Sequence, residues 1–153
     1  MTWQYHGTDF TEQGQWFGFV YRITNTHTGR CYIGRKLFSK AKIQHKTKTK
    51  KRKKLRVTSN WQNYWGSSAE LLVDIATLGE EHFHREIIRL TTKRGETNYY
   101  EALEILTSGA LLSDKFYNKW VSLRLHKSSL AHLSSSSPQL SGSLAPLIPG
   151  ASS

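Results

Sequence analysis

Two short stretches rich in aromatic and β-branched residues, separated by five turn-forming residues, are the feature that most constrains the fold. Residues 16–24 (Trp-Phe-Gly-Phe-Val-Tyr-Arg-Ile-Thr) and residues 30–33 (Arg-Cys-Tyr-Ile) have the composition of β-strands, because such side chains pack well on a pleated sheet. Residues 25–29 (Asn-Thr-His-Thr-Gly) have the composition of a glycine-containing turn. The sequence therefore predicts a β-hairpin.

A third strand is predicted further along the chain. Residues 83–90 (Phe-His-Arg-Glu-Ile-Ile-Arg-Leu) combine β-branched and aromatic side chains with charged ones. Strand alternation would direct Phe83 and Ile87 to one face and Ile88 and Leu90 to the other. We expect this strand to join the hairpin in one sheet.

Apolar residues at helical spacing predict a first helix over residues 69–78, with Ser67 or Ser68 as its N-terminal cap and Gly79 as its terminator. Four side chains of this helix are expected to lie in the core: Leu71, Leu72, Ile75 and Leu78.

A second helix is predicted over residues 95–106, with Thr97 or Asn98 available as its cap. Glu101 and Ile105 lie one turn apart and share a face of this helix. The Glu101 carboxylate can therefore point towards the edge of the sheet while its neighbours pack.

These elements carry a resemblance to a known family. Residues 19–21 (Phe-Val-Tyr) and 32–34 (Tyr-Ile-Gly) lie on the two hairpin strands, and residues 116–118 (Phe-Tyr-Asn) follow the second helix. In this order, the segments resemble the GIY-YIG nuclease superfamily, whose name records two tyrosine-bearing triplets on adjacent strands. The first triplet is a variant of the pattern and the second matches it fully. The resemblance covers roughly residues 17–120.

Within the superfamily, the chain is most similar to small phage-type (Seg-like) homing endonucleases. The supporting stretch is residues 32–36 (Tyr-Ile-Gly-Arg-Lys), then a basic insertion, then residues 61–68 (Trp-Gln-Asn-Tyr-Trp-Gly-Ser-Ser). The resemblance implies an α+β fold: a small three-stranded antiparallel sheet flanked by helices, with a basic loop insertion and a disordered C-terminal tail.

The resemblance also implies a metal-dependent DNA endonuclease that hydrolyses phosphodiester bonds in double-stranded DNA. The family has a single metal-binding glutamate on a helix, which places Mg²⁺ or Mn²⁺ on Glu101. Glu104, one turn along the same helix, competes for that role. The family's closing asparagine corresponds to Asn118, for which we expect a structural role in bonding backbone near the active centre.

The same resemblance gives roles to two tyrosines. In the family one tyrosine acts on the nucleophilic water, as a base or by positioning it, and this role falls on Tyr21. Tyr32 would orient water or phosphate by hydrogen bonding. A phenol with an ordinary pKa of about 10 is a poor base at neutral pH, so we expect a neighbouring cation such as Arg22 or Lys36 to lower the pKa of Tyr21.

The family also uses an arginine after the second triplet to hold the phosphate. The basic insertion displaces that region here, so no unique arginine can be carried over. Arg35 and Lys36 are the first candidates because they follow Gly34 closely, and Arg52 or Arg56 are the alternatives.

Net charge points to the same polyanionic partner. The formal charge is +11, and residues 40–56 hold ten of the 22 basic residues and none of the 11 acidic ones. Such a block repels itself, so we expect a mobile loop until the phosphate backbone neutralises it. The candidate DNA-binding residues are Lys50, Lys51, Arg52, Lys53, Lys54 and Arg56, together with Trp61 and Tyr64, which could instead pack in the core.

A protein that binds or packages nucleic acid without cutting it would share this charge, and Glu101 is the residue that such a protein would not need. The length predicts one domain over residues 1–126, followed by a Ser-rich disordered tail over residues 127–153. The sequence predicts no membrane span and no secretion signal. One cysteine suits a reducing cytoplasm, that of the host if the chain is phage-encoded. The oligomeric state is left open, and a monomer fits.

Overall fold

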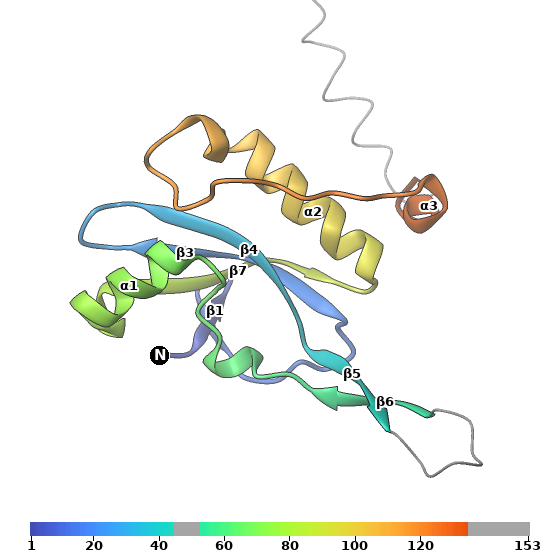
Figure 1. Ribbon diagram of the computed structural model, residues 1–153. Helices are drawn as coiled ribbons and strands as arrows, with labels where there is room; N and C mark the ends of the chain where they lie inside the picture. Colours follow the sequence, from blue (N-terminus) through green and yellow to red (C-terminus); the bar gives the residue numbers. More distant parts are fainter. Residues whose placement is uncertain (45–52, 135–153) are drawn as a thin grey trace, which may run out of the picture.

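A five-stranded sheet is the centre of the computed structural model, which describes residues 1–44 and 53–134 (Figure 1). In order across the sheet, the strands are β2 (Thr8–Phe10), β1 (Trp3–Tyr5), β7 (Phe83–Thr91), β3 (Gly18–Asn25) and β4 (Cys31–Leu37). Strands β1 and β7 are parallel, and all other neighbouring strands are antiparallel.

The α+β class is confirmed, but the predicted three-stranded antiparallel sheet is wrong. The three predicted strands correspond to β3, β4 and β7, and β1 and β2 extend the sheet into a mixed one of five strands. Each added strand has three residues, which is too short for an alternating pattern to be recognised.

The predicted β-hairpin is confirmed by β3 and β4. Tyr21 pairs with Gly34 and Ile23 with Tyr32. The turn is closed by Asn25, whose carbonyl accepts a hydrogen bond from the backbone nitrogen of Gly29 at 2.8 Å. The two tyrosine-bearing triplets are therefore side by side in the sheet.

A β-bulge in β7 overturns the predicted face of Leu90. The register between β7 and β3 shifts by one residue at Ile88, and an extra residue reverses the alternation beyond it. Leu90 consequently packs in the same buried cluster as Phe83 and Ile87.

Helix α1 (Ala69–Leu78) begins and ends as predicted. The Ser68 hydroxyl accepts a hydrogen bond from the backbone nitrogen of Leu71 at 3.3 Å, and Gly79 follows the last turn. Leu71 and Ile75 are buried as expected, but Leu72 is 43% exposed.

Helix α2 (Arg94–Thr107) begins earlier than predicted, with Lys93 at its N-cap position. The Glu96 carboxylate reaches back and accepts hydrogen bonds from the backbone nitrogen and the hydroxyl of Thr92, at 2.9 and 2.7 Å. Glu96 therefore caps the N-terminal end of α2, although it is itself a residue of the first turn. Thr97 is a buried helical residue bonded to Thr91, at 2.7 Å between hydroxyl oxygens.

The two faces of the sheet have separate cores. Tyr21 lies on the face that packs against α1 and Trp61, whereas its neighbour Val20 lies on the face that packs against Ile105 of α2. Figure 1 shows α1 and α2 on these two sides of the β3–β4 hairpin. Strand β4 forms one edge of the sheet, between the two helices.

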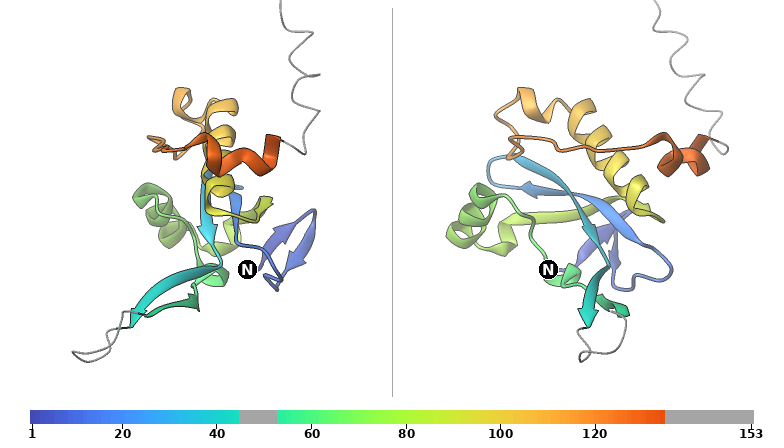
Figure 2. Two further views of the ribbon diagram at one scale, coloured as in Figure 1. Left: turned by 90° about the vertical axis from the view of Figure 1, so that its right-hand side faces the viewer. Right: turned by 45° about the vertical axis from the view of Figure 1, so that its right-hand side comes forward.

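The described part of the predicted basic loop is not a loop but a second sheet of two strands. Strands β5 (Ser39–Gln44) and β6 (Lys53–Thr58) pair antiparallel and project away from the main sheet (Figure 2). Lysine and arginine alternate here with apolar residues, a pattern typical of a strand. Lys50, Lys51 and Arg52 lie outside the described residues.

The remaining described elements are short: η1 (Trp61–Asn63), η2 (Glu80–His82), η3 (Ala110–Leu112), η4 (Lys127–Leu130) and α3 (Ala131–Ser134). The last two occupy the first part of the predicted tail, so that part is helical rather than disordered. It packs on the start of α2, where a β-carbon on Gly95 would lie 2.8 Å from that of Ser129. Residues 135–153 lie outside the description. No helix in the described part could cross a membrane.

Candidate active site

A pocket of about 530 Å³ opens beside β4, and it takes side chains from both faces of the sheet. Its lining includes six of the residues that the sequence singled out: Tyr21, Tyr32, Arg35, Tyr64, Glu101 and Asn118. Five of the six predicted catalytic residues therefore meet at this pocket, and Lys36 is the one that does not line it.

Tyr21 reaches the pocket because Gly34 stands opposite it. Its side chain is 1% exposed, and its ring lies 6.1 Å from that of Tyr32 and 6.2 Å from that of Tyr64. A β-carbon on Gly34 would overlap the Tyr21 hydroxyl. The glycine of the second triplet thus provides the space that the tyrosine of the first one fills.

The expected lowering of the Tyr21 pKa is not what the structure shows. Burial raises the pKa of Tyr21 well above its usual value, and Tyr32, Tyr64 and the Glu101 carboxylate act in the same direction. Neither proposed cation lies in the pocket lining. At neutral pH Tyr21 is a protonated phenol.

The two cations have other contacts. Arg22 pairs with Glu86 at 3.6 Å. The Lys36 ammonium lies 3.7 Å from the ring centre of Tyr64 and donates to the Asn60 side chain at 2.8 Å. Partial burial lowers the pKa of Lys36.

Tyr32 is partly buried and its hydroxyl lies 3.0 Å from that of Ser67. Burial raises the pKa of Tyr32 and the hydrogen bond with Ser67 opposes this rise. Gly66 allows this contact, because a β-carbon there would lie 3.0 Å from the Tyr32 ring. The sequence offered Ser67 only as a helix cap.

Glu101 and Arg35 form the charged pair of the pocket. Nε of Arg35 lies 2.9 Å from Oε2 of Glu101, whose side chain is 18% exposed. Burial raises the pKa of Glu101, and the Arg35 charge partly opposes the rise. Glu104 is on the same helix but is not part of the pocket lining. The geometry favours Glu101 as the carboxylate of this site.

The donor set fits a magnesium or manganese ion that has one protein carboxylate. Within residues 1–44 and 53–134, no group of three or more His, Cys, Asp or Glu side chains could hold a metal. Mg²⁺ keeps several waters and often binds through one or two carboxylates together with substrate phosphates. Glu101 would be that ligand, because its ion pair with Arg35 involves only Oε2. Glu70, the other carboxylate of the lining, has both oxygens paired, with Arg30 at 2.8 Å and with Lys119 at 3.3 Å.

Asn118 connects the closing segment, residues 115–121, to the edge strand β4. Its side-chain oxygen accepts from the backbone nitrogen of Ile33 at 2.9 Å, and its amide donates to the Ile33 carbonyl at 2.8 Å. These paired bonds suit the structural role expected for Asn118, because they hold β4 between Tyr32 and Arg35.

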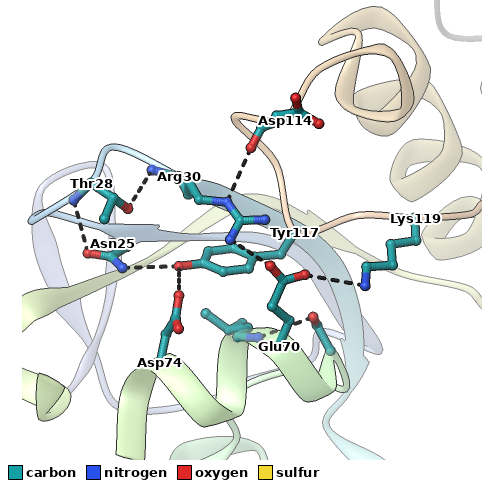
Figure 3. A network of polar contacts seen from close by, with 10 residues as sticks. Asn25, Thr28, Arg30, Glu70, Asp74, Asp114, Tyr117 and Lys119 are labelled. Carbon is teal, nitrogen blue, oxygen red and sulfur yellow. Dashed lines mark hydrogen bonds and ion pairs between the residues drawn. The ribbon is translucent and has the colours of Figure 1, made fainter. Parts of the chain in front are cut away.

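A polar network that the sequence did not predict supports the same region (Figure 3). The buried Tyr117 hydroxyl accepts from Asn25 at 3.0 Å and donates to Asp74 at 2.7 Å. Arg30 lies 4.1 Å from the Tyr117 ring centre and pairs with Glu70. The network joins the hairpin turn, α1 and the closing segment, and apart from Tyr117 its residues lie outside the segments that carry the family resemblance.

The predicted DNA-binding aromatics have different environments. Trp61 is 3% exposed and its carbonyl accepts a hydrogen bond from the Trp3 indole at 2.7 Å. Its prediction as a DNA-stacking residue is wrong, since it lies in the core. Tyr64 lies at the pocket with the Lys36 ammonium against its ring.

Lys54 and Arg56, the basic candidates of the insertion whose side chains the structure describes, do not line the pocket. Lys54 and Arg56 are exposed on β6, and Arg56 donates to the Ser39 hydroxyl at 2.9 Å. For Lys53, the structure describes only the backbone. Neither Arg56 nor Lys36 lines the pocket, which leaves Arg35 as the described arginine beside Glu101.

Comparison with known families agrees with this geometry. A family model described as "Putative endonuclease segE, GIY-YIG domain" matches residues 3–121, well over half of the chain. The matched range includes the whole five-stranded sheet, α2 and Asn118. Comparisons with curated proteins and with solved structures found no match. The chain belongs to the segE-type family of GIY-YIG endonuclease domains.

Proposed function

We propose that this protein is a metal-dependent endonuclease that hydrolyses phosphodiester bonds in double-stranded DNA, of the phage-type homing class. The observation that carries the proposal is the meeting of Tyr21, Tyr32, Arg35 and Glu101 around one pocket. Hydrolysis needs a positioned water, a cation beside the phosphate and a metal ligand, and these residue types supply the three.

Each side chain has a distinct task in this proposal. Arg35 binds a non-bridging oxygen of the scissile phosphate with its planar guanidinium. Tyr21 is held protonated by burial, so it positions the attacking water by a hydrogen bond. As the new P–O bond forms and the bond to the 3′ oxygen breaks, the proton of the water would pass to solvent and the 3′ oxygen would take one up from solvent. Tyr32, paired with Ser67 and on the same face of the sheet as Tyr21, orients the phosphate.

Glu101 would hold Mg²⁺ or Mn²⁺. When bound, the ion supplies positive charge beside the phosphoryl oxygens and the leaving 3′ oxygen. Before substrate enters, the Arg35 guanidinium occupies one carboxylate oxygen of Glu101. Phosphate binding by Arg35 would therefore free the carboxylate for the metal, so that substrate and metal bind cooperatively.

Binding to the duplex is assigned to the β5–β6 hairpin. Its described strands expose Lys40, Lys42, Lys54 and Arg56 and contain no acidic residue. A two-stranded ribbon has dimensions that the major groove admits, and its charges would neutralise the phosphates on either side.

Incubation with supercoiled plasmid in Mg²⁺, Mn²⁺ or EDTA tests the activity. Wild type is compared with Glu101→Gln and with Glu104→Gln, a matched control on the same helix that does not line the pocket. We expect metal-dependent nicking or linearisation, at least about 100-fold slower in Glu101→Gln, because loss of the metal ligand removes several kcal/mol of transition-state stabilisation.

Two outcomes contradict the proposal. Salt-sensitive gel retardation without cleavage in any metal would favour a nucleic-acid-binding protein that does not cut. Equal loss of cleavage in both glutamate variants would show that Glu101 has no special role.

A further inference from the structure

Trp120 is an exposed aromatic side chain at the rim of the pocket. It is 73% exposed, the most exposed of the five tryptophans, and it lines the same pocket as Tyr21 and Glu101. Water contact with so large an apolar ring is unfavourable, at about 25 cal/mol per Å². Tryptophan is enriched at binding interfaces because it combines a large apolar ring with an N–H donor, which makes an exposed tryptophan in the pocket lining a contact for the ligand of that pocket.

The backbone around Trp120 is fixed on both sides. Tyr117 and Asn118 before it are bonded to Asn25 and to the backbone of Ile33. Val121 after it packs against the buried cluster on the α2 face. The tryptophan is thus presented from an anchored segment, and little further ordering is needed for it to bind.

The charges beside Trp120 indicate what covers it. Lys119 precedes it and lines the pocket, with its side chain 73% exposed and its ammonium 3.3 Å from the Glu70 carboxylate, a contact that Figure 3 shows. Arg35 lies in the same lining. In a nucleotide the phosphate and the base are covalently linked, so a ring at the rim and cations inside the pocket match the two parts of one ligand. Aromatic rings combined with cations are the usual means of binding unpaired bases.

We infer that Trp120 stacks on a nucleobase displaced from the duplex beside the cleaved bond. The inference rests on the proposed nuclease function and narrows its substrate class. A base must leave its stack before an indole can cover its face, and this costs least where the base is mismatched or already unpaired. The preferred substrate is therefore DNA with an unstacked base at the cleavage position, rather than a fully paired duplex.

Binding of short duplexes in EDTA tests this without cleavage. One duplex carries 2-aminopurine in a mismatch and the other carries it fully paired. We compare wild type, Trp120→Ala, Trp120→Phe and the control Leu112→Ala, which removes a 93% exposed side chain outside the pocket lining. Thermal unfolding confirms that all four proteins are folded.

Wild type should bind the mismatched duplex at least about fivefold more tightly and quench its 2-aminopurine fluorescence. Trp120→Ala should lose this preference, with binding weakened by about 5- to 150-fold, the range that stacking on one base supplies. Trp120→Phe should keep part of the preference for the mismatched duplex, and Leu112→Ala should keep all of it. Equal binding of both duplexes by wild type, or an unchanged preference in Trp120→Ala, would overturn the inference.

The plasmid assay separates this inference from the proposed function. A protein that cleaves through Glu101 while Trp120→Ala binds like wild type would refute the stacking site alone. A protein that never cleaves but shows the Trp120-dependent preference would refute the nuclease and leave the base-binding site.

Discussion

Tyr21 and Glu101 line one pocket although they come from elements on opposite faces of the sheet. The two side chains can meet because β4 is an edge strand and because Gly34, on β4, has no side chain where the Tyr21 hydroxyl lies. The second triplet therefore contributes a tyrosine and also the gap through which the first tyrosine reaches the carboxylate side.

Replacing Gly34 with alanine should damage both stability and cleavage. The new β-carbon would collide with the Tyr21 hydroxyl, and overpacking of a core costs about 1–3 kcal/mol. Thermal unfolding of Gly34→Ala, Tyr21→Phe and the double variant measures the coupling. We expect Tyr21→Phe to recover part of the stability in the Gly34→Ala background. Strictly additive losses would show that the two residues do not collide.

Glu101 should titrate above an ordinary glutamate. Burial raises its pKa and Arg35 lowers it, so Arg35→Met should raise it further. Because the pKa of Glu101 is higher in the folded protein than in the unfolded chain, the folded state binds this proton more tightly. The stability that results is fully present below the unfolded pKa and is lost as the pH rises through the folded pKa. ¹³C NMR of the Glu101 carboxyl measures both pKa values. A lower pKa in Arg35→Met would contradict the ion pair.

Tyr21 should lower stability at alkaline pH. Its pKa is raised by burial, so the unfolded chain, with a phenol pKa of about 10, releases its proton first. The free energy of unfolding is therefore retained up to the unfolded pKa and decreases above it. Denaturant unfolding at increasing pH should show a smaller decrease in Tyr21→Phe than in wild type. An identical decrease would mean that Tyr21 ionises readily in the folded protein.

Neutralising the β5–β6 hairpin should flatten the salt dependence of DNA binding. Each lost phosphate contact reduces the slope of log K against log salt by about 0.9. Gel retardation at several salt concentrations compares a variant with Lys40, Lys42, Lys54 and Arg56 changed to Gln with a control carrying Lys93→Gln and Lys127→Gln. An unchanged slope in the hairpin variant would refute the DNA-binding role of this sheet.

Replacing Arg85 should destabilise the part of the pocket lining that contains Tyr64. It is 3% exposed and donates to the carbonyls of Gln62 and Tyr64 at 3.1 and 2.9 Å. Its guanidinium carbon lies 4.7 Å from the ring centre of Trp3 and 4.1 Å from that of Trp65. Burial lowers its pKa to about 10. Arg85→Lys cannot reproduce the planar fork. We expect a loss of about 1.5–3 kcal/mol or more, the contribution of one hydrogen bond to a charged group, measured by denaturant unfolding.

Local patterns predicted the elements that carry the site and missed those that depend on distant packing. The hairpin and α1 follow from strand composition and helical spacing. The Ile88 bulge has no signature in residues 83–90, because alternation alone would continue through it. The sequence left open whether Trp61 stacks on DNA or packs in the core, because its burial depends on Phe38 and Trp3, which are distant in the sequence.

The choice between Arg35 and Lys36 shows the same limit. Adjacent strand residues point to opposite faces, so one of the two had to lie on the α2 side. Which of the two residues lies on the α2 side depends on the pairing of β4 with β3 and on the face of the sheet that α2 covers. The residues around positions 35 and 36 determine neither the strand pairing nor the position of the helix.

The hydrogen bonds between β4 and the closing segment also prevent the edge of the sheet from pairing with a second molecule. Ile33 gives both its backbone groups to Asn118, and Cys31 gives its own to Lys115 and Tyr117, at 2.9 and 2.8 Å. An uncovered edge strand invites pairing with another chain. The segment that completes the pocket thus occupies the positions through which two copies could join their sheets, and a chain cut before residue 115 would be expected to aggregate as well as to lose its site.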